Sequence, residues 1–381
     1  MSSLSCPVAV FTQFSSNKEG QEQNKHKLHC LKFNGTKNSS PQKVDFISSQ
    51  DHHIAAMTSV NPPENMKPQN RQKIRTKKQQ VDPYRQGMIV EGVECRQTVV
   101  IRSYEVDPNK TATIESILNL LQETAFSHMW MSGLLSDGFG TTHGMMKNNL
   151  IWVVLRTRVQ VDRHPIWGEI MEIDTWVGAS GRNAMRRDWV LRSQATGLVF
   201  ARATSTCLMM NQKTRRLSKI PDEVRAEILP WFIDKQAIVE ESAEKIQKLD
   251  DNALYVAEDL KPRRSDLDMN HHVSNVKYAT WMLEAIPNEF LENHQLSDII
   301  LEYKRECGIS DVMQSLCEPQ EDQNSLSSNR TLEGNRRLES SNRGQFSYTH
   351  LLKIKGKPGD KAILKGRTIW KEKLQASPFS P

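Results

Sequence analysis

One short segment of the chain carries three polar side chains that could act together on a carbonyl compound. Asp268, Asn270 and His272 lie at positions i, i+2 and i+4. In an extended segment this spacing would point all three side chains to one face. A carboxylate, a carboxamide and an imidazole that meet there could activate water and hold a carbonyl group. The competing interpretation is a polar turn that caps a helix, because Asp, Asn and Ser favour such positions.

A second carboxylate and a thiol, Glu306 and Cys307, lie further along the chain. His271 would alternate to the opposite face of an extended segment from His272, so we expect it on the surface. His and Cys residues nowhere take the spacing of metal ligands, and the sequence therefore suggests no metal or organic cofactor. The six cysteines form no CxxC pair, which argues against a disulfide framework and fits a reducing compartment.

The basic charge of the chain is concentrated at its N-terminal end. Residues 1–85 contain 13 Lys and Arg against 6 Asp and Glu, a net charge of +7, whereas the whole chain carries +6. A nucleic-acid surface across the fold is therefore not predicted. Because residues 1–85 are polar and lack sustained apolar periodicity, we expect a disordered segment. Its start is rich in Ser and has no acid before Glu19, which fits a transit peptide with a linker, or otherwise an ordinary tail.

Two successive parts of the chain show the same pattern, a helix followed by strands. Apolar residues recur at helical spacing over Ile114 to Met129 and again over Val276 to Ile286. Strand patterns follow at 150–161, 169–177, 183–191 and 198–210 in the first part, and at 298–306, 347–355 and 362–370 in the second. This pattern predicts an α+β fold in which each helix packs on an antiparallel sheet. The longest apolar run, 150–155, is too short to span a membrane as a helix.

The same patterns suggest where the units begin and end. We expect an N-terminal unit over 86–240, an acidic connector over 241–258 and a C-terminal unit over 259–372. Residues 318–343 are rich in Ser, Asn, Glu and Arg and predict a flexible insertion within the second unit. Residues 373–381 would form a tail.

Short segments, taken in their order and spacing, resemble the plant acyl-acyl carrier protein (acyl-ACP) thioesterases. The resemblance runs from Arg96 to Trp370. It is carried by residues 101–106, 119–124, 137–140, 149–154, 185–189, 209–211, 214–217, 260–264, 266–278 and 303–307. The B-type class, linked to saturated acyl chains, is closer than the A-type, since residues 81–84 and 134–140 favour it.

The resemblance implies a fold, an activity and a partner. The fold would be a tandem hotdog, two units each with a long helix packed on an antiparallel β-sheet, with the acyl-chain pocket in the first unit. The activity would be hydrolysis of long-chain acyl-ACP in the plastid stroma, which releases free fatty acid and ends chain elongation. The acyl carrier protein would bring the acyl chain on its phosphopantetheine. Because that protein is acidic, basic residues could dock it, namely Arg186, Arg187, Lys213, Arg215 and Arg216.

By the same resemblance, Asp268, Asn270, His272 and Glu306 are expected at catalytic positions. Asp268 and Glu306 could together hold and deprotonate water, because two carboxylates that share a site raise one of their pKa values. Asn270 and His272 would orient the water or polarise the carbonyl. A rival scheme makes Cys307 the nucleophile, His272 its base and Asn270 the orienting group. We favour water attack, because the rival leaves both carboxylates without a role.

Other classes of function stay open on the sequence alone. A hotdog-fold acyl dehydratase, or a non-hydrolytic acyl-ACP or acyl-CoA binding protein, would also use a His and a carboxylate but would not need Asp268, Asn270 and Glu306 together. A nucleic-acid-binding protein would rest only on residues 1–85 and would lose its function on their removal. The hydrolase hypothesis expects neither nucleic acid nor an integral membrane segment, and it leaves a homodimer as one option for assembly.

Overall fold

The computed structural model describes the following residues: 81–82, 87–135, 140–239, 245–250, 252–269, 271–320, 345–356 and 362–373. They belong to one compact unit that runs from Lys77 to Pro381. Apart from Val81 and Asp82, the expected N-terminal segment 1–85 lies outside the described residues. So do most of the expected insertion 318–343 and all but the first residue of the expected tail 373–381.

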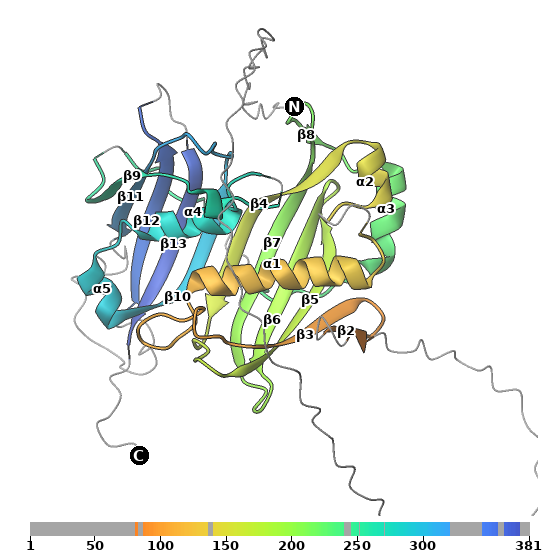
Figure 1. Cartoon of the computed structure of the whole chain (residues 1–381), viewed down its shortest axis with the longest axis horizontal. Coiled ribbons are helices and arrows are strands. Elements are labelled where there is room, and N and C mark those ends of the chain that lie inside the picture. The colour runs from red at the N-terminus through yellow and green to blue at the C-terminus, as the bar shows by residue number, and fades with distance from the viewer. Residues whose placement is uncertain are drawn as a thin grey trace, which may run out of the picture. The chain divides into compact units, whose positions relative to one another are not determined.

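The strands of the described residues join into one antiparallel sheet. Their order is β1-β2-β3-β5-β6-β7-β4-β10-β13-β12-β11-β9, and β8 pairs with β7 (Figure 1). The strands are β1 (Val81–Asp82), β2 (Gly87–Val90), β3 (Glu94–Val100), β4 (Leu150–Val161), β5 (Ile170–Ser180), β6 (Ala184–Ser193), β7 (Val199–Asn211), β8 (Leu217–Ser218), β9 (Tyr255–Leu260), β10 (His294–Tyr303), β11 (Met313–Gln320), β12 (Gln345–Ile354) and β13 (Ala362–Glu372).

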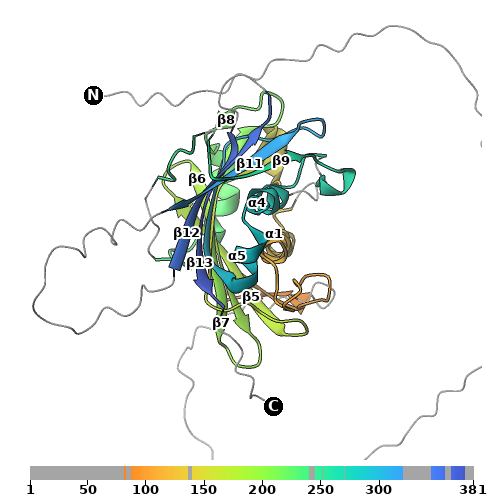
Figure 2. The same ribbon diagram turned by 90° about the vertical axis from the view of Figure 1, so that its left-hand side faces the viewer.

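Two helices cover the same side of this sheet, as Figure 2 shows. Helix α1 (Ile114–Met131) lies over the first group of strands, and α4 (Asn275–Leu283) lies over the second. Shorter helices complete the described structure: α2 (His143–Lys147), α3 (Asp222–Ile228), η1 (Leu229–Trp231), η2 (Arg264–Asp266) and α5 (Asn288–Asn293). None of the described helices is both long enough and apolar enough to cross a membrane.

Helix α1 begins and ends at residues that suit these positions. The Thr113 hydroxyl accepts a hydrogen bond from the Ser116 N–H at 3.1 Å, which caps one of the free donors of the first turn. Gly133 follows the helix with a φ of 69°, a conformation that glycine adopts without strain. Between them, Ile117, Leu118 and Leu121 are buried against the sheet, so the predicted apolar stripe is confirmed.

The two halves of the sheet meet at the pairing of β4 with β10, which runs from Asp298 opposite Gln160 to Glu302 opposite Arg156. Above this junction the two helices touch through polar groups, because the Glu115 carboxylate of α1 accepts hydrogen bonds from Lys277 and Thr280 of α4. The main hydrophobic core extends under both helices. The predicted α+β arrangement of two helix-on-sheet halves is therefore present, fused through one continuous sheet.

In the second half of the fold, two strands differ from the pattern expected from the sequence. Strand β11 has no counterpart among the predicted strands, and its last residues, Glu318 to Gln320, fall in the expected insertion. Strand β9 starts at Tyr255, within the expected connector. Both strands pair with each other, and β11 also pairs with β12. Their main-chain hydrogen bonds to distant partners stabilise them although their local apolar pattern is weak.

Candidate active site

The segment from Leu267 to Val273 is a closed loop and not an extended strand. Leu267 and Val273 form an antiparallel bridge, and the Asp268 N–H donates to the His272 carbonyl at 2.7 Å. His271 has a φ of 61°, a left-handed conformation that His tolerates better than most residues. The interpretation of an extended face is therefore wrong, and the competing interpretation of a polar turn before a helix fits this loop. The predicted exposure of His271 is confirmed. Asn270 lies outside the described residues.

Two carboxylates meet at His272 from different directions. The Asp268 carboxylate accepts a hydrogen bond from the His272 backbone N–H at 3.1 Å, which fixes the loop. The Glu306 carboxylate, in the loop after β10, lies 3.1 Å from the Nδ1 atom of the His272 ring. The structure thus brings together Asp268, His272 and Glu306 from separate parts of the sequence.

This contact decides which ring nitrogen of His272 is available for chemistry. A carboxylate only accepts hydrogen bonds, so Nδ1 carries the proton in the contact with Glu306. In the neutral ring, Nε2 then holds a lone pair and can accept a proton. Both side chains are about half exposed, 42% for His272 and 40% for Glu306, so a substrate or water molecule can reach them.

Arg215 is a further member of the site. It lies in the turn between β7 and β8, and its guanidinium is hydrogen-bonded to the same Glu306 oxygen that faces His272. From the sequence, Arg215 is expected among the residues that could dock an acidic partner. Since 91 positions separate it from Glu306, no local pattern could have revealed the pair.

Cys307 lies beside the site but points into the core. It is 6% exposed and belongs to the main core cluster. Its backbone N–H donates to the Tyr278 hydroxyl at 3.0 Å. Burial raises the pKa of the Cys307 thiol to about 11, so the thiol stays protonated near neutral pH. A protonated, buried thiol is a poor nucleophile, which weighs against the rival scheme.

Helix α4 begins directly after the loop, with Ser274 as its N-cap residue. The Ser274 side chain makes no capping hydrogen bond, so it does not compete for the N–H groups of the first turn. The N-terminal end of a helix carries a positive partial charge and donors without helical partners. This end of the helix starts two residues after His272 in the chain.

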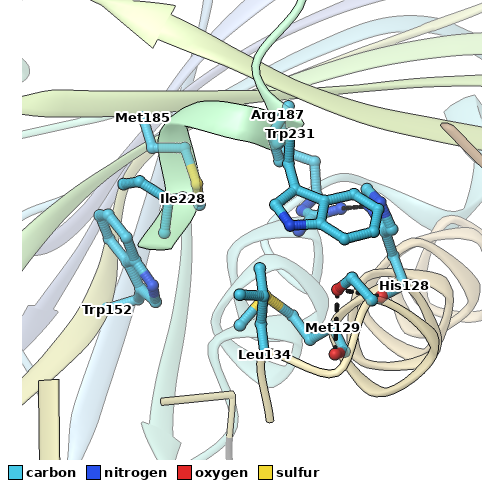
Figure 3. Close-up of a pocket in the computed structure, with 10 residues that line it drawn as sticks. His128, Met129, Leu134, Trp152, Met185, Arg187, Ile228 and Trp231 are labelled. Carbon is cyan, nitrogen blue, oxygen red and sulfur yellow. Dashed lines mark hydrogen bonds between the residues drawn. The ribbon is translucent and has the colours of Figure 1, made fainter. Parts of the chain in front are cut away.

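A pocket opens elsewhere, between the C-terminal end of α1 and the strands that it covers (Figure 3). Its lining residues are His128, Met129, Ser132, Leu134, Trp152, Val177, Met185, Arg187, Ile228 and Trp231. In Figure 3, Trp152, Met185 and Ile228 gather on one side, and His128, Arg187 and Trp231 on the other. The pocket therefore has an apolar end and a polar end.

Arg187 and His128 form the polar end. The Arg187 guanidinium donates to His128 Nδ1 at 3.0 Å and to the Thr175 hydroxyl at 3.3 Å. Burial, and then the charge of Arg187, lower the pKa of His128 to about 3, while burial lowers the pKa of Arg187 to about 10. Arg187 is only 5% exposed, so the expectation that it docks an acidic partner at the surface is wrong.

Comparisons with known proteins identify the family of the chain. A family model described as the acyl-ACP thioesterase N-terminal domain matches residues 92–228, and one described as the acyl-ACP thioesterase C-terminal domain matches residues 250–372. The chain belongs to the acyl-ACP thioesterase family. The predicted membership is confirmed.

Relatives within this family are of the B type. A chloroplastic palmitoyl-acyl carrier protein thioesterase of Gossypium hirsutum is 46% identical over 295 residues, which cover 77% of this chain and 68% of that protein. One of Arabidopsis thaliana is 52% identical over 238 residues, which cover 62% of this chain and 58% of that protein. The chain thus spans between 58% and 68% of these two relatives' own length. A Cuphea viscosissima relative, 44% identical over 77% of this chain and 66% of its own length, carries the name FATB2.

A solved structure of the family confirms the fold. The 12:0-ACP thioesterase from Umbellularia californica is 42% identical, covers 74% of this chain and 96% of its own, and superposes with a TM-score of 0.66. The predicted tandem hotdog fold is therefore present in this member of the acyl-ACP thioesterase family.

Proposed function

We propose that this chain hydrolyses the thioester of long-chain acyl-ACP and releases free fatty acid, which ends chain elongation in fatty acid synthesis. The contact of 3.1 Å between Glu306 and His272 Nδ1 carries the proposal, since it leaves Nε2 able to activate water beside the N-terminal end of α4. The names of the relatives, palmitoyl and dodecanoyl hydrolases of acyl carrier protein, support the substrate class.

The proposed reaction needs no covalent intermediate on the enzyme. His272 Nε2 takes a proton from water while the water oxygen bonds to the thioester carbon. The first turn of α4 binds the oxyanion, and one such donor typically contributes about 3 kcal/mol. The C–S bond then breaks, and the departing phosphopantetheine thiolate takes the proton from Nε2. The products are a fatty acid and the free thiol of the carrier protein.

The other residues have supporting roles in this proposal. Asp268 holds the loop through the His272 backbone, and a shared water between Asp268 and Glu306 remains the alternative predicted from the sequence. Asn270 keeps its predicted role of orienting water or the carbonyl. Residues 86–240 would hold the acyl chain, and residues 259–372 would carry the catalytic groups.

The relatives' names also suggest where the protein acts. Several are named chloroplastic, which supports a plastid location for this chain. The stroma follows within the proposal because soluble acyl carrier protein is the substrate carrier. Assembly as a homodimer remains an option of the proposal.

Purified full-length protein, incubated with palmitoyl- and dodecanoyl-acyl carrier protein, tests the activity. Free thiol and free fatty acid should appear in equal amounts. His272→Asn should lower kcat/KM by about 100-fold or more, because it removes the base. His271→Asn is the control, since Asn also adopts the left-handed backbone of this exposed position.

Two results would contradict the proposal: a wild-type protein that leaves both thioesters intact, or a His272→Asn variant with wild-type rate. A dehydratase would be recognised in the same assay, because 3-hydroxyacyl-acyl carrier protein would give an enoyl thioester without release of thiol.

A further inference from the structure

We propose that Arg215, which lies in the half of the fold that contains the pocket, is a positioning residue for hydrolysis at His272. It would act through Glu306, by holding the carboxylate in place and by offsetting its charge. The inference rests on the proposed function and assigns a role in hydrolysis to a residue that the sequence predicts only as a docking residue.

The turn that carries Arg215 is rigidly built. The Asn211 side chain accepts hydrogen bonds from the N–H groups of Lys213 at 3.1 Å and Thr214 at 2.9 Å. The Arg215 N–H donates to the Asn211 carbonyl at 2.8 Å. Asn211 itself ends β7, opposite Leu150 of β4. The turn is therefore fixed to the sheet, and the position of Arg215 does not depend on a loose loop.

The backbone of Arg215 favours a different residue type. Its φ of 55° is in the left-handed region, which glycine or asparagine adopts more readily than arginine. The side chain is only 22% exposed, whereas the neighbouring Arg216 is exposed. Arginine is a poor choice for this backbone, yet its side chain turns inward to a carboxylate of the other half of the fold. The contact of the side chain with Glu306, and not the shape of the turn, therefore explains why arginine occupies this position.

Arg215 and His272 contact the same oxygen of Glu306. With the carboxylate held from the side of the guanidinium, the ring of His272 has one defined partner and one orientation. The charged groups that these contacts place at His272 are Asp268, Glu306 and Arg215. Burial raises the pKa of the nearby Tyr278 and Cys307, so both stay protonated. Arg215 is the cation of this set, and it weakens the attraction of Glu306 for a proton on His272.

This arrangement predicts a change in pH dependence. His272 must be neutral to act as a base, so activity falls when acid protonates the imidazole. Loss of Arg215 leaves the charge of Glu306 uncompensated, which favours the protonated imidazole. The acid limb of the rate profile should therefore move to higher pH. A residue that only docks the carrier protein would change KM and leave this limb in place.

The test is the pH profile of kcat and kcat/KM with palmitoyl-acyl carrier protein. Arg215→Gly suits the left-handed backbone, so the variant should unfold no earlier than wild type on heating. It should lower kcat by about 10- to 100-fold, as expected for a misplaced catalytic group, and move the acid limb up by about 0.5 to 1 pH unit. Arg215→Lys keeps the charge and should retain an acid limb close to that of wild type.

Arg216→Gln is the charge-matched comparison, because it removes the same charge from the same turn. Its effects should fall on KM alone. The inference is overturned if Arg215→Gly keeps the kcat and acid limb of wild type, or if it matches Arg216→Gln. Failure of the proposed function would look different, since wild-type protein would then release no thiol.

Discussion

His272 is held by two carboxylates that have different tasks. Asp268 binds the backbone of the loop, and Glu306 binds the ring. The first contact sets where the imidazole lies, and the second sets which nitrogen carries the proton. A carboxylate on Nδ1 stabilises the imidazolium that forms when Nε2 accepts a proton. His272 and Glu306 together therefore suit a general base that activates a water molecule for attack.

At the residue scale we expect Cys307→Ala to keep its activity. The thiol is buried and its pKa is raised to about 11 by that burial, so it is neither exposed nor ionised for attack. The variant should retain kcat/KM within about threefold of wild type, since water attack does not use the thiol. Initial rates of thiol release measure this, with His272→Asn assayed alongside. A loss as large as that of His272→Asn would restore the nucleophile scheme.

The residue types of the site could be predicted from the sequence, but their geometry could not. Asp268, His272 and Glu306 are indeed together, yet the rule of alternate positions assumes an extended backbone, and the left-handed His271 closes the segment into a loop. The role of Arg215 depends on a sheet that brings β7 near the loop after β10. Contacts of that kind are set by tertiary structure and leave no local pattern.

Among the secondary-structure elements, β5 stabilises residues 233–235, the segment that follows η1. The backbone of Val177 accepts the N–H of Ile233 at 3.0 Å. Further along, the carbonyl of Lys235 accepts the Trp176 indole N–H at 2.7 Å and the Arg186 guanidinium at 2.9 Å. Ile228 and Trp231, which precede this segment, line the pocket of Figure 3, so the docking of the segment helps to hold that wall of the pocket.

Gly178→Ala tests that support. A Cβ at Gly178 would lie 2.7 Å from the backbone carbonyl oxygen of Ile233. A change of side-chain rotamer cannot relieve a clash with a backbone atom. We expect the segment to shift and the free energy of unfolding to fall by about 1 to 3 kcal/mol, the usual range for overpacking. Urea unfolding measures it. Gly308→Ala is the control, because its nearest neighbour would be Asp311 at an ordinary 3.6 Å; equal stability losses would refute the argument.

Elements with strong local signals were predictable, and those held by distant partners were not. Helix α1 and strand β4 match their predicted ranges closely because their apolar spacing is regular. Strand β11 has few apolar residues and includes Pro319. Its pairing with β9 covers Met313 to Cys317 and leaves Pro319 beyond it, so the missing N–H breaks no bond of that pair.

On the scale of the whole compact unit, the continuous sheet and shared core couple the two halves. The β4–β10 pairing is reinforced by ion pairs of Arg158 with Asp298 at 2.8 Å and of Arg156 with Glu302 at 3.0 Å. The core cluster includes Ile117 of one half and Met282 of the other. We therefore expect one cooperative unfolding transition, to which buried groups in either half contribute.

Two buried histidines, one in each half, make this stability sensitive to acid. Burial lowers the pKa of both His128 and His350 from 6.5 to about 3. Between these values the unfolded chain binds protons that the folded chain does not, so stability is complete above pH 6.5 and declines as the pH falls towards 3. At pH 5 each histidine should have lowered the free energy of unfolding by about 2 kcal/mol relative to pH 7.

His350→Gln keeps a group that can form a hydrogen bond with Thr368, the partner of His350 at 2.8 Å. The variant should therefore lose about 2 kcal/mol less stability than wild type between pH 7 and pH 5. The exposed His143→Gln is the control. Urea unfolding at both pH values measures the difference, and an acid sensitivity in His350→Gln equal to that of wild type would show that His350 is not neutral in the fold.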